Sequence, residues 1–437
     1  MQTFFSLQAL ADPEMAETEK ILRACVHCGF CSATCPTYLL TGDELDGPRG
    51  RIYLIKEMFE KERPADARTA LHIDRCLSCL SCMTTCPSGV HFMHLVDHAR
   101  AHIEKTYARP VTERAMRGAL AFVLPRPSLA RPLFRVAAAI RPLARWLPRR
   151  IAAALALAPS SLPPASGVDA PQVFAAQGAR KMRVALLNGC VQTVVDASIN
   201  EATIRLLTRH GVEVVVAKGA GCCGALPHHL GKVDESLRYA RANIDAWTRE
   251  IDSGGLDHII VNASGCGTSV KDYGHMFRND PTLADKAAHI SAMTKDVTEL
   301  MTEIGFAPSG DAPKLRVAYH SACSLQHGQK ISQEPIALLA AAGFDVVPVP
   351  EGHICCGSAG TYNVLQPKLA GALRSRKVAN IESVAPDIVA AGNIGCIIQI
   401  RSGMGIPVLH TVELLDWASG GPEPDALARR EIASAVF

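Results

Sequence analysis

Two short cysteine motifs near the start of this 437-residue chain constrain its N-terminal part more than any other feature. They read CVHCGFCSATCP, from Cys25, and CLSCLSCMTTCP, from Cys76, and both have the spacing Cys-x2-Cys-x2-Cys-x3-Cys-Pro. Three thiolates on one short loop can hold three corners of a 4Fe–4S cluster, and the fourth cysteine then ligates the other cluster. Zinc sites more often use paired Cys-x2-Cys units. The motifs therefore predict two 4Fe–4S clusters.

The spacing also predicts that the two motifs exchange ligands. One cluster is expected to be held by Cys25, Cys28, Cys31 and Cys86. The other is expected to be held by Cys76, Cys79, Cys82 and Cys35. Between the motifs, GPRGRIYLIKEMFEKE places Ile52, Ile55 and Phe59 at helical spacing, and HLVDHARAHIEKTYA after Cys86 has the same character. We therefore expect residues 1–108 to form an all-helical ferredoxin domain.

Three arginines lie close to these motifs in the sequence: Arg49, Arg51 and Arg75. They could raise the cluster potentials or meet an acidic partner. Arginine side chains are mostly exposed in proteins, so the interpretation we favour is that all three are solvated.

The second half of the chain is a duplication. MRVALLNGCVQT, from Met182, aligns with LRVAYHSACSLQ, from Leu315, and VEVVVAKGAGCCG aligns with FDVVPVPEGHICCG. In both copies, short β-branched runs alternate with longer helical segments, which indicates a parallel α/β unit. We define copy 1 as residues 181–310 and copy 2 as residues 311–437. The predicted fold class is thus α + α/β, a helical two-cluster domain followed by two duplicated cysteine-rich domains.

Each copy carries a Cys-Cys-Gly triplet. Neighbouring Cα atoms lie about 3.8 Å apart, which is below the usual disulfide range. Every cysteine of the copies follows a predicted strand, where open α/β sheets gather their ligands. We therefore expect four thiols per copy to converge on a metal site, although buried structural thiols are the alternative. The two sets are Cys190, Cys222, Cys223 and Cys266, and Cys323, Cys355, Cys356 and Cys396.

Two further features of the copies bear on these sites. The glycine after each cysteine pair is expected to let the backbone approach a bulky ligand. Four nearby histidines could be ligands or proton carriers, but single histidines are more often structural. They are His228, His229, His320 and His353.

The connecting segment, residues 109–180, is basic and rich in proline. Ten arginines and one acid, Glu113, lie between Arg109 and Arg150. The prolines argue against one continuous helix. Two interpretations stay open: contact with an anionic membrane surface, or packing between the two halves with the arginines facing water.

Composition limits the partners and the compartment. A net charge of +3 predicts no bulk attraction to nucleic acid or to a membrane. The N-terminus has acids where a signal peptide needs basic residues, and no apolar run reaches the ~18 residues of a membrane span. We expect a cytoplasmic protein with reduced thiols, in which contact with the cytoplasmic face of the inner membrane is an open addition.

The duplicated Cys, Cys-Cys-Gly, Cys arrangement resembles the cysteine-rich domain of heterodisulfide reductase and its relatives. Joined to a two-cluster ferredoxin, it is similar to the iron–sulfur subunits of glycolate oxidase; subunits for D-lactate and anaerobic glycerol 3-phosphate oxidation share the arrangement. The fullest motif of this family ends in Cys-x2-Cys, and Ala263 and Asn393 replace the earlier cysteine here. Four thiolates per copy suffice for a 4Fe–4S cluster or for zinc, but the loss of the fifth argues against a disulfide-reducing noncubane centre.

The resemblance implies an electron-transfer subunit. In subunits of this kind the substrate is oxidised elsewhere, so a flavin-binding partner is expected to oxidise glycolate to glyoxylate. The electrons are then expected to pass through this chain towards a quinone or another acceptor. The alternatives are the equivalent subunit for D-lactate or glycerol 3-phosphate, a thiol or disulfide enzyme, and a non-catalytic scaffold.

Overall fold

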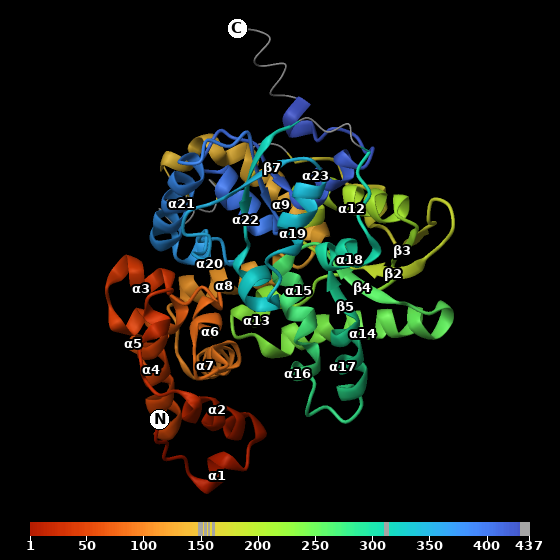
Figure 1. Cartoon of the computed structure of the whole chain (residues 1–437). Coiled ribbons are helices and arrows are strands. Elements are labelled where there is room, and N and C mark those ends of the chain that lie inside the picture. Colours follow the sequence, from red (N-terminus) through yellow and green to blue (C-terminus); the bar gives the residue numbers. More distant parts are fainter. Residues whose placement is uncertain (147–151, 153–154, 156–157, 160–161, 310–313, 429–437) are drawn as a thin grey trace.

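A helical N-terminal part is followed by two α/β units in the computed structural model of the chain (Figure 1). The structure describes all residues except 147–151, 153–154, 156–157, 160–161, 310–313 and 429–437. The helical part, red to orange in Figure 1, contacts copy 1 through α7 and α13 and copy 2 through α3 and α21. The predicted fold class is confirmed.

The N-terminal part contains short helices, and proline begins three of them at Pro13, Pro36 and Pro48. Proline suits the first helical position because its missing N–H would have no partner there. The predicted apolar face of α4 is fully packed, with Ile55 completely buried. The elements are α1 (Leu7–Leu10), α2 (Pro13–Ala24), η1 (Phe30–Ser32), α3 (Pro36–Thr41), η2 (Glu44–Asp46), α4 (Pro48–Glu60), α5 (Ala67–Asp74), α6 (Ser81–Thr85) and α7 (Phe92–Thr106).

The connecting segment is helical but interrupted, as its prolines predict. Its described helices are α8 (Val111–Val123), α9 (Pro127–Ile140) and the 3-10 turns η3 (Arg141–Trp146) and η4 (Gly167–Asp169). Its last element, β1 (Gln172–Phe174), pairs antiparallel with β3 of copy 1. The predicted connector thus supplies an edge strand to the first sheet. The predicted boundary at 310/311 lies outside the described residues.

Copy 1 is built on the sheet order β1-β3-β2-β4-β5, in which all pairs except β1–β3 are parallel. Its strands are β2 (Met182–Leu186), β3 (Val212–Val216), β4 (His258–Val261) and β5 (Thr294–Asp296). Its helices are α11 (Gln192–Val195), α12 (Ser198–Arg209), α13 (Ala225–His229), α14 (Val233–Gly254), α15 (Ser264–Lys271), α16 (Tyr273–Met276), α17 (Ala284–Met293) and α18 (Val297–Ile304).

Copy 2 repeats this order as β7-β6-β8-β9, with every pair parallel. Its strands are β6 (Arg316–His320), β7 (Asp345–Pro348), β8 (Ile388–Ala391) and β9 (Val408–His410). Its helical elements are the π-helical η5 (Ser324–Gln329), α19 (Glu334–Ala341), α20 (Tyr362–Leu365), α21 (Pro367–Glu382), α22 (Ile394–Arg401) and α23 (Thr411–Ala418).

The two copies pack in a reciprocal manner. Helix α12 of copy 1 contacts α23 of copy 2, and the equivalent helices α19 and α18 contact each other. Arg205 and Arg209 of α12 both pair with the buried Asp416 of α23, at 2.8 and 2.9 Å. One apolar core includes Val184 of copy 1 and Val317 of copy 2, so the copies form one body.

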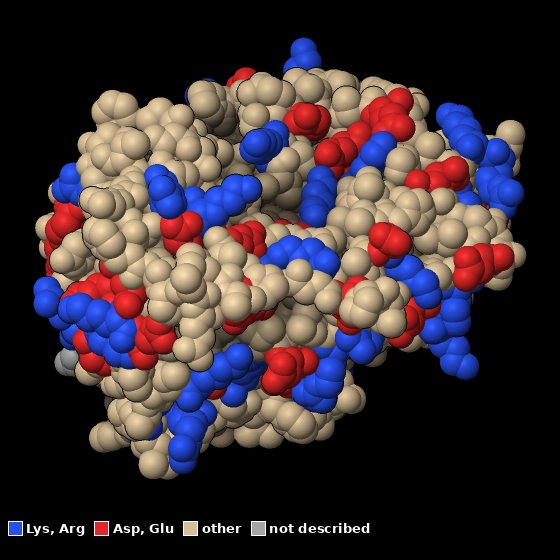
Figure 2. All heavy atoms as spheres, turned by 90° about the horizontal axis from the view of Figure 1, so that it is seen from below, with Lys and Arg blue, Asp and Glu red and all other residues tan. Residues whose placement is uncertain are grey.

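The surface seen from below mixes both signs of charge. Figure 2 shows Lys and Arg interspersed with Asp and Glu around a central hollow. This face agrees with the small net charge of +3. Among the described residues, none of the helices combines the length and the apolarity that crossing a bilayer requires.

Candidate metal centres

The first N-terminal thiol set surrounds one cavity. Cys25, Cys28 and Cys31 line it together with Cys86 of the second motif, and Cys82 lines both this cavity and the next one. Burial, followed by the neighbouring Cys25 thiol, raises the pKa of Cys31 to about 11. A cationic metal centre is what stabilises such thiols as thiolates. The set therefore suits an iron–sulfur cluster in number and donor chemistry.

The second set lines a neighbouring cavity formed by Cys35 and by Cys76, Cys79 and Cys82. The structure thus brings each fourth cysteine to the other motif's loop, as the predicted exchange requires. Burial raises the pKa of Cys79 well above its ordinary value, and the thiols of Cys323 and Cys35 add to this effect. That these eight thiols are the cluster ligands stays a prediction.

The two loops share an unusual backbone conformation. His27 and Gly29 of the first have positive φ angles of 56° and 87°, and the equivalent Ser78 and Leu80 of the second have 50° and 62°. A left-handed conformation is unfavourable for a bulky residue such as leucine. Both loops keep this shape, and the three thiols of each loop line a cavity.

Arg51 is buried beside the second set, so the prediction that it is solvated is wrong. Its side chain is 1% exposed and donates to the His72 carbonyl at 2.8 Å and to Thr37 Oγ1 at 3.0 Å. Its Nη1 lies 3.8 Å from Cys35 Sγ. The completely buried Asp46 compensates its charge at 3.9 Å. A signal was available in the sequence, because Arg51 lies at helical spacing with Leu54 and Ile55 on the buried face of α4.

The other two arginines near the motifs are more accessible. Arg49 pairs with Glu44 at 2.6 Å while 37% of its side chain is exposed. Arg75 pairs with Asp46 at 2.8 Å and is 29% exposed. For these two the solvated interpretation is closer to the structure.

The four thiols of copy 1 form a chain. Cys222 is hydrogen-bonded to Cys190 and Cys223, and Cys223 is also bonded to Cys266. Because Cys222 and Cys266 bond to it, the pKa of the Cys223 thiol lies well below its ordinary value. Cys190 follows β2, the Cys222–Cys223 pair follows β3, and Cys266 lies in the first turn of α15. The predicted convergence at the strand ends is what the structure shows.

The four thiols of copy 2 form an equivalent chain. Cys323 Sγ lies 3.7 Å from Cys355 Sγ. Cys355 bonds to the thiol of Cys356, which in turn bonds to Cys396. Cys355, Cys356 and Cys396 are all buried, with exposed fractions of 1–3%. Four soft donors per copy fit iron–sulfur or zinc chemistry, and their metal binding stays a prediction.

The glycine after each cysteine pair has a positive φ and packs closely against a helix. Gly224 and Gly357 have φ angles of 86° and 89°, and a Cβ on either would meet a helix carbonyl. The clash is with Ser236 O of α14 at 2.8 Å in copy 1 and with Ala370 O of α21 at 2.7 Å in copy 2. Glycine is thus needed for helix packing behind the loop. Its N–H also points to the sulfur two residues earlier, at 3.4 Å in both copies.

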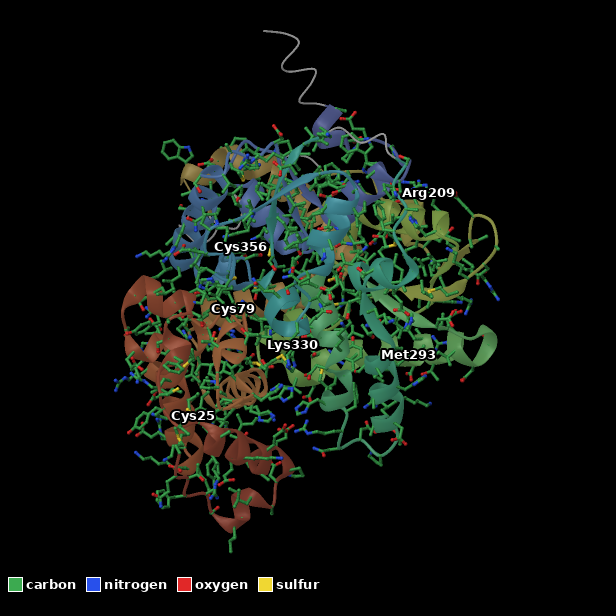
Figure 3. The ribbon with its side chains drawn as sticks, viewed as in Figure 1. Cys25, Cys79, Arg209, Met293, Lys330 and Cys356 are labelled. Atoms are coloured by element: carbon green, nitrogen blue, oxygen red, sulfur yellow. The ribbon has the colours of Figure 1, made fainter. Side chains whose placement is uncertain are left out.

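The second N-terminal set directly adjoins copy 2. Cys79 and Leu77 share a buried cluster with Cys355 and Tyr362, and Cys323 packs against it. Figure 3 shows Cys25, Cys79 and Cys356 in succession from the helical part to copy 2. No pattern in the sequence pairs Cys79 with Cys355, because this contact depends on how two domains pack.

Copy 1 meets the helical part through polar groups instead. His228 Nε2 lies 3.2 Å from the carboxylate of Asp97 on α7. Burial opposes ionisation of both groups, but their attraction raises the pKa of His228 and lowers that of Asp97. Burial lowers the pKa of the adjacent His229 to about 4.

The four candidate histidines therefore differ in position. His228 forms an ion pair between domains, and the His353 carbonyl lies 3.2 Å from His327 Nε2. Only His320 of the four belongs to a potential metal-ligand group among the described residues, with Cys356 and Cys396.

Comparisons with known proteins agree with this architecture. Residues 21–90 match a 4Fe-4S dicluster domain, and residues 184–271 and 317–401 match a cysteine-rich domain. The chain is 42% identical over 418 residues to the glycolate oxidase iron-sulfur subunit of Escherichia coli K12, covering 96% of this chain and 99% of that protein. This chain belongs to the glycolate oxidase iron–sulfur subunit family. The predicted family and 4Fe–4S cofactors are confirmed.

Other relatives are more distant. A probable glycolate oxidase iron-sulfur subunit of Bacillus subtilis is 29% identical over 91% of this chain and 94% of its own length. Lactate utilization protein A of Bacillus licheniformis is 27% identical over 54% of this chain and 99% of its own length. A crystal structure of a hypothetical protein from Helicobacter pylori has the same fold, with a TM-score of 0.56 at 11% identity, covering 95% of this chain and 74% of that one.

Proposed function

We propose that this chain is the electron-transfer subunit of a complex in which a flavin-bearing partner oxidises glycolate to glyoxylate. Its 42% identity over nearly the full length of a glycolate oxidase iron-sulfur subunit supports the substrate. The lactate utilization relatives match only 54% of this chain and support D-lactate less well. The chemistry on the hydroxy acid belongs to the partner, and this chain receives the electrons.

The succession of thiol sets carries the proposal. We infer that Cys25, Cys28, Cys31 and Cys86 hold one cluster and that Cys76, Cys79, Cys82 and Cys35 hold the other. When bound, 4Fe–4S clusters accept and donate single electrons. The chain's own residues hold these groups in neighbouring cavities. They shield the second set from water, since Cys76 and Cys79 are 7% and 8% exposed, whereas Cys28 of the first set is exposed. The buried cluster that Cys79 shares with Cys355 continues the succession to copy 2.

A substrate comparison tests the proposal. The full chain, co-expressed with its flavin-bearing partner, should reduce a dye with glycolate, and the chain alone should not. D-Lactate and glycerol 3-phosphate serve as the alternative substrates. Faster dye reduction with D-lactate would reassign the complex, and glycolate turnover by the flavin-free chain alone would refute the subunit role.

We further propose that helix α9 contacts the cytoplasmic face of the inner membrane, where a quinone could accept the electrons. Large apolar side chains form one exposed row along α9 and η3, at spacings of three and four residues. They are Leu129, Leu133, Val136, Ile140 and Leu143, with exposed fractions of 37–56%. Exposed Arg135 and Arg141 flank the row, and no acid occurs from residue 114 to 168. An apolar row bordered by cations suits an anionic lipid surface.

Other arginines of the connecting segment pack within the protein. Arg109 and Arg117 both pair with Asp74, and Arg131 donates to the Thr193 carbonyl at 2.9 Å. The packing interpretation therefore describes these arginines. The side chain of Arg145 and residues Arg149 and Arg150 lie outside the described part.

Vesicle sedimentation tests the membrane contact. The purified complex should bind vesicles that contain anionic lipid at low salt and be released by high salt. Replacing Leu133 and Val136 by Asn should weaken binding, whereas Arg109→Gln should not if the protein stays folded. If the Asn variant still bound vesicles at high salt, the α9 row would not be the membrane contact. If the wild-type complex bound no vesicles at all, the row would have to contact something other than a membrane.

A further inference from the structure

His320 is the last residue of β6 and is almost completely buried in copy 2. Its exposed fraction is 1%. Neither ring nitrogen has a hydrogen-bond partner within the described part of the chain. A buried polar group without a partner is costly and rare in folded proteins. The position of this imidazole therefore requires an explanation.

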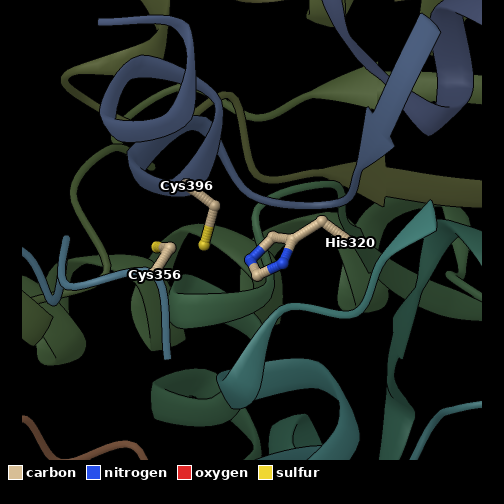
Figure 4. A group of neighbouring side chains, drawn as sticks. All are labelled: His320, Cys356 and Cys396. Carbon is tan, nitrogen blue, oxygen red and sulfur yellow. The ribbon is translucent and has the colours of Figure 1, made fainter. Parts of the chain in front are cut away.

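The imidazole lies beside two thiols of copy 2. A ring nitrogen of His320 and the sulfur atoms of Cys356 and Cys396 all lie within 4.8 Å of one another. Figure 4 shows the three side chains beside one another, with the sulfur of Cys396 next to the ring of His320. The three side chains come from the end of β6, the loop after β7 and the first turn of α22. Nitrogen and sulfur donors that converge from separate elements are typical of sites for zinc or iron.

The equivalent residue of copy 1 cannot serve in this way. When Cys190 is aligned with Cys323, His320 aligns with Leu187. Leu187 is also 1% exposed and packs in the apolar core of copy 1. The two copies therefore present the same four thiols but differ in one buried side chain, which is apolar in copy 1 and a nitrogen donor in copy 2.

We propose that His320 is a nitrogen ligand of the metal centre of copy 2, beside the thiolates of Cys356 and Cys396. The inference rests on the proposed metal binding of copy 2. The metal bound there is one that accepts mixed nitrogen and sulfur donors, either iron in an iron–sulfur centre or a zinc ion. A neutral imidazole carries one negative charge less than a thiolate, so an iron centre held in this way is reduced more easily than one held by thiolates alone.

The test uses the full chain, purified anaerobically with its metals and labelled with 15N-histidine. Iron and zinc are counted first, in the wild type and in Cys356→Ser, which shows whether copy 2 holds a metal. For iron, pulsed electron paramagnetic resonance should detect a histidine nitrogen coupling that changes with the 15N label. For zinc, X-ray absorption should show a Zn–N distance of about 2.0–2.1 Å besides Zn–S at about 2.3 Å.

Two variants complete the experiment. His320→Leu, which reproduces the residue of copy 1, should abolish the nitrogen signal. His410→Gln is the matched control, because His410 also ends a strand and is 1% exposed, but it bonds to the Asn262 carbonyl at 2.7 Å. The control should keep the signal. If His320→Leu fails to fold, His320→Gln, which keeps a polar side chain there but carries no labelled imidazole, should abolish the signal in its place.

The outcomes separate two proposals: that copy 2 binds a metal, and that His320 is one of its ligands. A metal in copy 2 with sulfur ligands only would overturn the role of His320 and leave the proposed metal site intact. Metal counts that do not change in Cys356→Ser would overturn both. A nitrogen signal that is lost in His320→Leu and kept in His410→Gln supports both.

Discussion

The two cysteine-rich copies have the same four thiols, but the surroundings of these thiols differ. In both, four cysteines follow three strands of a parallel sheet in the same order, and a glycine with positive φ packs against a helix carbonyl. Copy 2, however, contacts Cys79 through buried apolar groups, whereas copy 1 meets the helical part through the Asp97–His228 ion pair. The difference teaches that duplication preserves local geometry, while packing against a third domain gives each copy its own environment.

The largest expected effect tests whether copy 2 alone lies on the electron route. Replacing Cys355 by Ser should lower dye reduction by the complex roughly 100-fold, because it removes a proposed metal ligand from the buried cluster of Cys79. The matched substitution Cys222→Ser in copy 1 should have a much smaller effect on the same assay. Equal losses in both variants would remove the proposed distinction between the copies.

The next prediction concerns the exchange of ligands between the two N-terminal motifs. This exchange decides which thiols share a cluster with Cys79, the cysteine that shares a buried apolar group with copy 2 in the comparison above. Cys86→Ser should reduce the iron content by up to about four atoms per chain and damage the cluster of Cys25, Cys28 and Cys31. Iron analysis and low-temperature spectroscopy measure this. Damage restricted to the cluster of Cys79 would contradict the exchange.

The glycines should behave alike in both copies, because each lies against a helix backbone. Gly224→Ala and Gly357→Ala combine an unfavourable φ with a Cβ contact below 3 Å. Each should reduce the free energy of unfolding by about 3 kcal/mol. Gly371→Ala on α21 is a control, since nothing lies within 4 Å of its added Cβ. Thermal denaturation gives the comparison, and a neutral Gly357→Ala would show that the α21 backbone can move away.

The smallest expected effect concerns the polar contact of copy 1. Asp97→Asn should cost about 2 kcal/mol near pH 6, because it leaves His228 partly buried without its carboxylate. Arg100, His229 and Asp272 also face this pair electrostatically, so the variant changes only one of several charges.

The pH dependence follows from the directions of the two pKa shifts. The raised pKa of His228 gives stability that is full below its unfolded value of about 6.5 and is lost as the pH rises through the folded value. The lowered pKa of Asp97 gives stability that is full above about pH 4 and is lost on further acidification. Unfolding of wild type and Asp97→Asn should therefore differ most between about pH 4 and 6.5. A difference that grows above pH 8 would exclude this pair as the cause.

Local patterns determined much of this protein in advance. The spacing of the eight N-terminal cysteines predicted which thiols share a cavity, because three ligands on one short loop leave little choice for the fourth. The repeat predicted two parallel sheets, since β-branched runs and helical segments recur in one order. The break between α8 and α9 before Pro127 also followed from the sequence, whereas Pro132 lies inside α9 and does not end it.

Other properties were decided only by the tertiary structure. Arg51 is buried because Asp46, Thr37 and the His72 carbonyl surround it, and these partners come from separate turns and helices. The contact of Cys79 with Cys355 and the approach of His320 to Cys356 join residues that no sequence period relates. A local pattern records which face of a helix or strand is apolar, but it does not record which distant surface will cover that face. The sequence by itself therefore determined the number and type of the thiol sets, and the packing of three domains decided which sets meet.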